Sequence, residues 1–286
     1  MNLLNKINAG MNQLEAKLRR IQFLTGNSLK MIAILTMLFD HFCKIVLPWF
    51  VDNYWSVLEK TGQISTQQFL DIDWFIRSKL YAVGTVAFPL FCFLLTEGFH
   101  YTKNRTRYIC SMLAFALLSE LPFDLGFFSF LSQRANTYPF YWEYQNVFFT
   151  LLLGLIMMLC LEKFSCKTKN RADRIKAFVL QLISVIIISA LAELIHSDYG
   201  TEGILIIAAF YVARGNRLYQ VILFLIAYIL ATGAQPTIPI LISCILILLY
   251  NGKRGKLKLK YSFYVFYPVH IVILYGITLL LPYVVK

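Results

Sequence analysis

Several stretches of this chain are apolar over the length that a helix needs to cross a lipid bilayer, about 20 residues. Hydrophobic residues make up 58% of the 286 positions and charged residues only 15%. Soluble globular proteins rarely have this composition, so we predict an all-α, polytopic integral membrane protein. We expect nine transmembrane helices, at about 29–50, 80–99, 106–121, 146–162, 176–196, 200–213, 218–233, 237–250 and 261–283.

The lysines and arginines predict the orientation of these helices. Of the 27 such residues, 21 lie before the first helix core or in alternate connections, five lie in the other connections and at the C-terminus, and Lys44 lies inside the first span. Cytoplasmic loops retain cations, so we predict a cytoplasmic N-terminus and an extracytoplasmic C-terminus, in the cytoplasmic (inner or plasma) membrane. The same pattern accounts for the net charge of +12 without a nucleic-acid partner.

Residues 1–28 form a separate segment in this prediction. Their apolar residues recur every three or four positions, opposite Lys6, Lys17 and Arg20, which is typical of an amphipathic helix on the cytoplasmic membrane surface. A pairing helix for homo-oligomerisation is the alternative. Residues 29–286 then form the transmembrane domain. The six cysteines contain no CxxC pair, so neither a disulfide framework nor a metal site is predicted.

The first predicted span contains four ionisable residues, Lys30, Asp40, His41 and Lys44. Ionisable groups inside hydrocarbon are costly, and this makes a functional site the default hypothesis. Lys30 and His41 are eleven positions apart and so return to nearly the same helix face. We predict that His41 accepts a proton in the outer half of the membrane. Its orienting carboxylate is expected from another helix, with Asp124 or Asp198 as the candidates.

Other polar residues are expected to complete the site. Those predicted near the level of His41 are Glu120, Gln145, Asn146, Tyr199, Tyr264 and His270. Gln145, Asn146 or Tyr264 is the expected hydrogen-bond donor to a developing oxyanion. At the cytoplasmic ends of the helices lie Lys30, Glu97, His100, Lys103, Arg105, Arg107 and Lys260.

The cytoplasmic cations have two interpretations. They are topology determinants or contacts to anionic lipids, or they bind the phosphates of a nucleotide-bearing donor. Glu97 has a structural alternative, an ion pair with Arg105 or Arg107. The histidines His100 and His270 have one as well, as hydrogen-bonding groups in helix packing.

Six ordered segments resemble the TraX family of membrane proteins, which is named for the acetylase of conjugative pilin. They are LKMIAILTMLFDH (29–41), AFPLFCFLLTEGFHYTKNRTRY (87–108), LLSELPFDL (117–125), QNVFFTLLLGL (145–155), DYGTEGILIIAAFYVAR (198–214) and KYSFYVFYPVHIVILY (260–275). Lys30, ten residues and His41 are also similar to the Arg-or-Lys, ten residues, His signature of membrane acyltransferases that acetylate surface glycans. Cys43 and Lys44 depart from the small residues expected there.

This resemblance implies an acetyltransferase that uses cytoplasmic acetyl-CoA. His41 would be the catalytic base or acyl carrier, and Lys30 would lie near the donor entrance. The acceptor would be an extracytoplasmic or membrane-embedded peptide or glycan, such as a pilin amine or a glycan hydroxyl. The rival hypothesis is a transporter or ion-coupled permease in which Asp40, His41 and Lys44 relay protons or ions.

Overall fold

The computed structural model describes residues 3–166, 168, 170–256 and 262–284. Within this part of the chain the regular structure is helical, with two isolated bridges between extended residues. The elements are α1 (Leu3–Leu18), α2 (Gly26–Ile45), α3 (Leu47–Phe50), η1 (Val51–Trp55), α4 (Ser56–Lys60), α5 (Thr66–Phe75), η2 (Ile76–Leu80), α6 (Tyr81–Gly84), α7 (Ala87–Tyr101), α8 (Arg105–Arg134), α9 (Val147–Lys163), α10 (Arg171–Leu194), α11 (Gly200–Val212), α12 (Arg217–Thr232), α13 (Ile238–Leu248) and α14 (Ser262–Val284). The prediction of an all-α protein is confirmed for these residues.

Five helical stretches of the described chain are long and apolar enough to cross a membrane. They are Gly26–Lys60, Thr66–Tyr101, Arg105–Arg134, Arg171–Leu194 and Ser262–Val284. The first two contain 35 and 36 residues, which corresponds to about 50 Å at 1.5 Å per residue. Both are longer than the hydrocarbon core of a bilayer, which is about 30 Å thick. The connection expected at 51–79 is therefore mostly helical, and its turn is confined to 61–65.

Four predicted spans coincide with shorter helices. α9 has 17 residues, α11 has 13, α12 has 16 and α13 has 11. Each is below the length of about 20 residues that an upright crossing needs. The five long stretches indicate a membrane protein, while nine crossings remain a prediction.

The chain forms two compact units. Unit 1 comprises Met1–Leu29, Pro89–Ala116 and Glu143–Lys256, and unit 2 comprises Lys30–Phe88, Leu117–Trp142 and Leu257–Lys286. Helices α2, α7 and α8 contribute residues to both units. The polar residues predicted for one site therefore divide between the two units.

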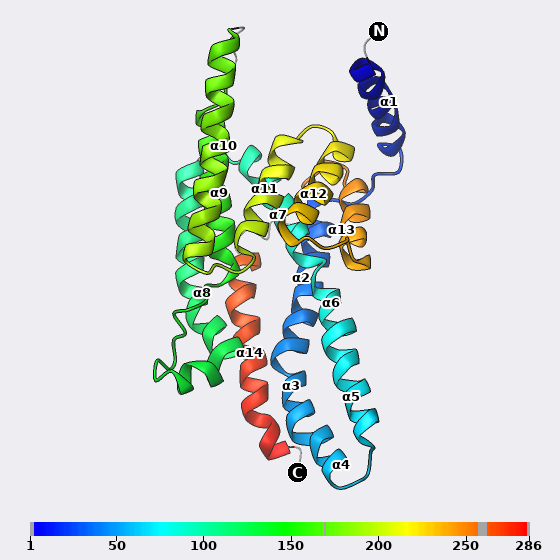
Figure 1. Cartoon of the computed structure of the whole chain (residues 1–286), viewed down its shortest axis with the longest axis vertical. Coiled ribbons are helices and arrows are strands. Elements are labelled where there is room, and N and C mark those ends of the chain that lie inside the picture. The colour runs from blue at the N-terminus through cyan, green and yellow to red at the C-terminus, as the bar shows by residue number, and fades with distance from the viewer. Residues whose placement is uncertain (1–2, 167, 169, 257–261, 285–286) are drawn as a thin grey trace. The chain divides into compact units, whose positions relative to one another are not determined.

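Unit 1 is a helical bundle with an aromatic core. α9, α10 and α11 pack against one another, and α12 packs against α11 (Figure 1). Gly154 allows the close approach of α9 and α11, because a Cβ atom there would collide with Ile207. Phe93, Phe210 and Phe224 are fully buried, and Phe210 contacts the rings of the other two. These three rings form one contiguous aromatic contact inside unit 1.

Unit 2 brings three helices together at one glycine. α2 continues through α3, η1 and α4, and the chain returns through α5, η2 and α6 (Figure 1). On α8, a Cβ atom at Gly126 would lie 2.6 Å from Cγ2 of Ile271 and 3.2 Å from Cδ1 of Ile45. Because Gly126 has no side chain, α14 and α2 can both pack closely against α8. The residues next to this contact form the polar centre of unit 2.

Candidate functional site

Two histidines distant in sequence form a direct hydrogen bond in unit 2. Nδ1 of His41, on α2, lies 2.7 Å from Nε2 of His270, on α14, and the ring planes differ by 14°. The rings of Phe127 and Tyr267 approach His41 edge-on, with centroids 5.0 and 5.8 Å from that of the imidazole. His270 is buried, whereas His41 is partly accessible. Both residues were predicted site residues, and the structure brings them together.

The hydrogen bonds assign the protons of both imidazoles. Nδ1 of His270 lies 2.7 Å from the carbonyl oxygen of Phe266. A carbonyl oxygen only accepts, so Nδ1 of His270 carries the hydrogen and Nε2 of the neutral ring is an acceptor. Nδ1 of His41 must therefore donate to it. The lone pair of neutral His41 is then on Nε2, which makes no hydrogen bond to the described residues.

The orienting partner of His41 differs from the prediction. A carboxylate was expected, but the hydrogen bond comes from His270. Asp124, buried in unit 2, instead accepts a hydrogen bond from the backbone nitrogen of Tyr141 at 3.0 Å. Asp198 belongs to unit 1, where the hydroxyl of Tyr144 lies 3.4 Å from its carboxylate. A histidine of fixed tautomer orients His41 without adding a negative charge beside it.

Asp40 is compensated within its own helix. Its Oδ2 lies 2.8 Å from Nζ of Lys44, one turn farther along α2. The carboxylate also packs against Gly84 of α6 so closely that a Cβ atom there would overlap it. Its Oδ1 is buried and has no hydrogen-bond partner among the described residues. Asp40 and Lys44 therefore form an ion pair that is distinct from the histidine pair.

Lys30 and His41 contact the same neighbouring helix, which is consistent with the face predicted from their spacing. Nζ of Lys30 lies 5.1 Å from the centroid of Phe263, near the start of α14, while His41 contacts His270 farther along it. The two contacts show that α2 and α14 run in the same direction. Lys30 and His41 are eleven positions apart in α2, which corresponds to about 16 Å of helix rise.

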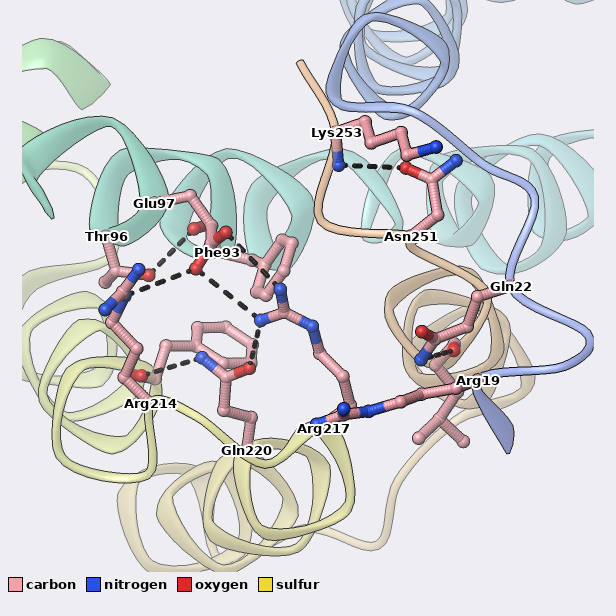
Figure 2. Close-up of polar contacts among 12 residues, drawn as sticks. Arg19, Gln22, Phe93, Thr96, Glu97, Arg214, Arg217, Gln220, Asn251 and Lys253 are labelled. Atoms are coloured by element: carbon pink, nitrogen blue, oxygen red, sulfur yellow. Dashed lines mark hydrogen bonds and ion pairs between the residues drawn. The ribbon is translucent and has the colours of Figure 1, made fainter. Parts of the chain in front are cut away.

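A second polar centre, which we call the arginine cluster, lies in unit 1 (Figure 2). It consists of Glu97, Arg214, Arg217 and Gln220. Nη2 of Arg217 and Nε of Arg214 lie 3.3 and 3.5 Å from the two carboxylate oxygens of Glu97. Gln220 accepts a 2.6 Å hydrogen bond from Nη1 of Arg217. The buried carboxylate on α7 is thus held by the turn between α11 and α12.

This arrangement corrects the structural interpretation of Glu97. Arg105 is paired with Glu162 on α9, and its guanidinium lies 3.8 Å from the ring centroid of Phe99. The cations that Glu97 does contact are 117 or more positions away in sequence, because the α11–α12 turn folds back onto α7. Gly215, with a φ of 109°, supplies the left-handed backbone conformation of that turn.

Asn146 has a structural role at the start of α9. Its Oδ1 accepts a hydrogen bond from the backbone nitrogen of Phe148, at the start of α9. Its Nδ2 donates to the carbonyl oxygen of Ala116 at 2.8 Å, and the residue is fully buried. Both ends of the amide are therefore used to cap one helix and tie it to another. The oxyanion role of this residue stays a prediction.

The remaining predicted residues are divided between the two units. In unit 1, His100, Lys103 and Arg107 are exposed, Gln145 pairs through its backbone with the segment 196–198, and Tyr199 precedes α11 with a φ of 65°. In unit 2, Glu120 and Tyr264 are partly buried, and Lys260 lies outside the described residues. Within the described chain no group of three metal-ligating side chains is found.

The comparisons with known proteins cover most of this chain. A probable fimbrial assembly protein FimC, serogroup H1, from Dichelobacter nodosus is 28% identical over 272 residues, which cover 90% of this chain and 96% of that protein. No solved structure matches the chain. The family profile described as TraX protein matches residues 25–278, which include α2 with His41 and α14 with His270. Over nearly its whole length, therefore, this membrane protein belongs to the TraX family.

Proposed function

We propose that this protein transfers an acetyl group from acetyl-CoA to an amine or hydroxyl acceptor, with His41 as the general base and His270 as a positioning residue. One observation carries the proposal: a directional hydrogen-bond chain runs from the carbonyl of Phe266 through His270 to Nδ1 of His41. It leaves Nε2 of His41 as the basic atom. Family membership and the fimbrial relative support a membrane protein of pilus or fimbrial assembly.

In the proposed reaction, Nε2 of His41 removes a proton from the acceptor as the acceptor nitrogen or oxygen attacks the thioester carbonyl carbon. The new C–N or C–O bond forms and the C–S bond breaks. The leaving thiolate then takes the proton back from Nε2. During this cycle His41 is transiently an imidazolium, and its Nδ1–H bond to His270 becomes charge-assisted.

The membrane arrangement fits a donor and an acceptor on opposite sides. α2 and α14 run in the same direction, which requires an odd number of crossings when both helices are counted. The predicted nine is odd, and so is the number of long apolar stretches, five. With the N-terminus in the cytoplasm, Lys30 lies at the donor side and His41 farther outward. A reporter fused after Lys286 is expected on the extracytoplasmic side.

The acceptor is proposed as a pilin amine or a glycan hydroxyl. The name of the D. nodosus relative refers to fimbrial assembly, which favours a component of a surface fibre. Transfer to either acceptor uses the same base, because both an amine and a hydroxyl must lose a proton during acylation.

The test is transfer of label from radiolabelled acetyl-CoA to cell-envelope material by the protein purified in nanodiscs. His41→Ala is expected to lower the rate about 100- to 10,000-fold, the usual contribution of a general base. His196→Asn is the matched control. His196 is exposed, has a φ of 48° that asparagine tolerates, and lies in unit 1.

Equal transfer by wild type and His41→Ala, with both proteins folded, would exclude the proposed role of His41. Absence of any donor binding or transfer by the wild type would exclude acetyl transfer altogether. Initial-rate kinetics add a second criterion, since direct transfer requires a ternary complex and ping-pong kinetics would instead indicate an acyl-histidine.

A further inference from the structure

The arginine cluster of unit 1 contains more positive than negative charge. The carboxylate of Glu97 is the one acidic group that the described residues place against the two guanidinium groups of Arg214 and Arg217. Two positive charges against one negative charge leave an excess of one. The side chains are only 27% and 14% exposed for Arg214 and Arg217, respectively. Uncompensated charge at such depth is costly, and an additional anion would remove that cost.

Both arginines retain unused hydrogen-bond donors. Nε of Arg214 is buried and faces Glu97, so a ligand cannot reach it, but Nη1 and Nη2 of Arg214 donate no hydrogen bond to the described residues. The hydrogen bonds of Arg217 come from Nη1 and Nη2, which leaves its Nε–H without a described acceptor. The single carboxylate of Glu97 is shared by two guanidinium groups. The donors that it does not use can bind a second acceptor.

The cluster is also rigid. The guanidinium carbon of Arg217 lies 5.1 Å from the ring centroid of Phe93 and 4.8 Å from that of Tyr250. Gln220 is fully buried and is itself fixed by a 2.9 Å hydrogen bond from its Nε2 to the carbonyl oxygen of Phe210. Figure 2 shows Arg214 and Arg217 converging on Glu97 from the same turn. A guanidinium that lies against two rings is pre-organised for a planar, bidentate anion contact.

Two further cations lie shortly after Tyr250, whose ring contacts Arg217. Tyr250 leads directly into a loop in which Lys253 and Arg254 are exposed. This loop is anchored in unit 1, because the carbonyl oxygens of Lys253 and Arg254 accept hydrogen bonds from the backbone nitrogens of Gly26 and Asn27, at 2.8 and 2.9 Å. The position of the loop is therefore fixed by contacts that leave its cationic side chains available.

We propose that Arg214 and Arg217, assisted by the Lys253 loop, bind the phosphate groups of an anionic ligand. The two arginines have excess positive charge and unused N–H donors. Phosphate suits both, because it has several acceptor oxygens and up to two negative charges. The choice of ligand rests on the proposed function, which makes the phosphates of acetyl-CoA the first candidate. A phospholipid headgroup has the same chemistry and is the second source.

The test uses the full chain in phosphatidylcholine nanodiscs. Adenosine 3′,5′-bisphosphate, which carries two of the three phosphates of CoA and no thioester, is titrated against wild type and Arg214→Gln. This substitution leaves the neutral pair of Glu97 and Arg217 and so is expected to fold. We expect its affinity to fall about 10- to 100-fold, the effect of losing charge-assisted hydrogen bonds. Arg174→Gln removes an exposed cation of α10 in the same unit and serves as the control.

A second arm compares thermal unfolding with and without phosphatidylglycerol in the nanodiscs. Bisphosphate binding that Arg214→Gln weakens supports the donor as the source. Stabilisation by phosphatidylglycerol that Arg214→Gln abolishes supports a lipid headgroup. If neither probe distinguishes Arg214→Gln from Arg174→Gln, the cluster is structural only and the proposal is overturned. Bisphosphate binding does not require His41, so its retention in an inactive His41→Ala protein would separate the two proposals.

Discussion

Replacement of His270 by leucine tests the function of the histidine pair most directly. Leucine fills a similar volume but cannot accept the hydrogen from Nδ1 of His41, which His270 accepts at 2.7 Å. If His270 positions His41 and stabilises its charged form, the variant should bind acetyl-CoA normally and turn over slowly. The expected change is therefore in kcat and not in KM for the donor.

The size of the effect follows from the change in that hydrogen bond during the reaction. Bonds between neutral groups contribute roughly 0.5–1.5 kcal/mol, and bonds to charged groups roughly 1.5–3 kcal/mol. The difference, about 1–1.5 kcal/mol, acts only once His41 has taken up the proton, and corresponds to about 5- to 13-fold in rate. Without His270 the hydrogen of neutral His41 can also move to Nε2. We therefore expect kcat to fall about 10- to 50-fold.

The assay is acetyl transfer to envelope material at saturating acetyl-CoA, with thermal unfolding to confirm that each variant is folded. His270→Gln retains a side-chain oxygen that can accept from His41 and should recover part of the rate. A folded His270→Leu protein with wild-type kcat would refute the reasoning. So would a defect confined to KM, since this would place His270 in donor binding.

Two glycine substitutions and one charge substitution test the packing around the polar centres of the two units. Gly84→Ala would place a Cβ atom in the carboxylate of Asp40 and should lower stability by about 1–3 kcal/mol; an unchanged Tm would contradict the contact. Gly126→Ala must displace Ile271, whose Cγ2 would lie 2.6 Å from the new Cβ atom, and with it the neighbouring His270. Acetyl transfer should therefore fall while donor binding persists. Lost donor binding with unchanged transfer would contradict this role of Gly126. Glu97→Ala leaves both arginines of the cluster without their carboxylate and should cost about 3–5 kcal/mol in unfolding experiments, whereas a loss below about 1 kcal/mol would mean that the pair is well hydrated.

The sequence alone predicted the features that depend on local pattern. Apolar stretches of bilayer length indicated an all-helical membrane protein, and five such helical stretches are present. The spacing of Lys30 and His41 indicated a shared helix face, and both contact α14. These predictions succeed because helix geometry is set by neighbouring residues, and because the cost of placing polar groups in hydrocarbon applies wherever the chain later packs.

The partners of the buried polar groups were decided by tertiary structure. His41 was expected to have a carboxylate partner and has His270; Glu97 was expected near Arg105 or Arg107 and contacts Arg214 and Arg217 instead. The sequence contained two unspecific signals. One was Gly126, two positions after Asp124, which forms the helix contact, and the other was the short cationic turn around Gly215.

Such pairings depend on how far one helix slides and rotates against another. Gly126 fixes that register because it has no side chain, and the methyl groups of Ile271 and Ile45 occupy the space that a side chain would fill. A shift of one helical turn, about 5.4 Å, would leave every apolar pattern in the sequence intact and yet separate His41 from His270. The sequence therefore determined which residues required partners, and only the packing of the helices determined which partners they received.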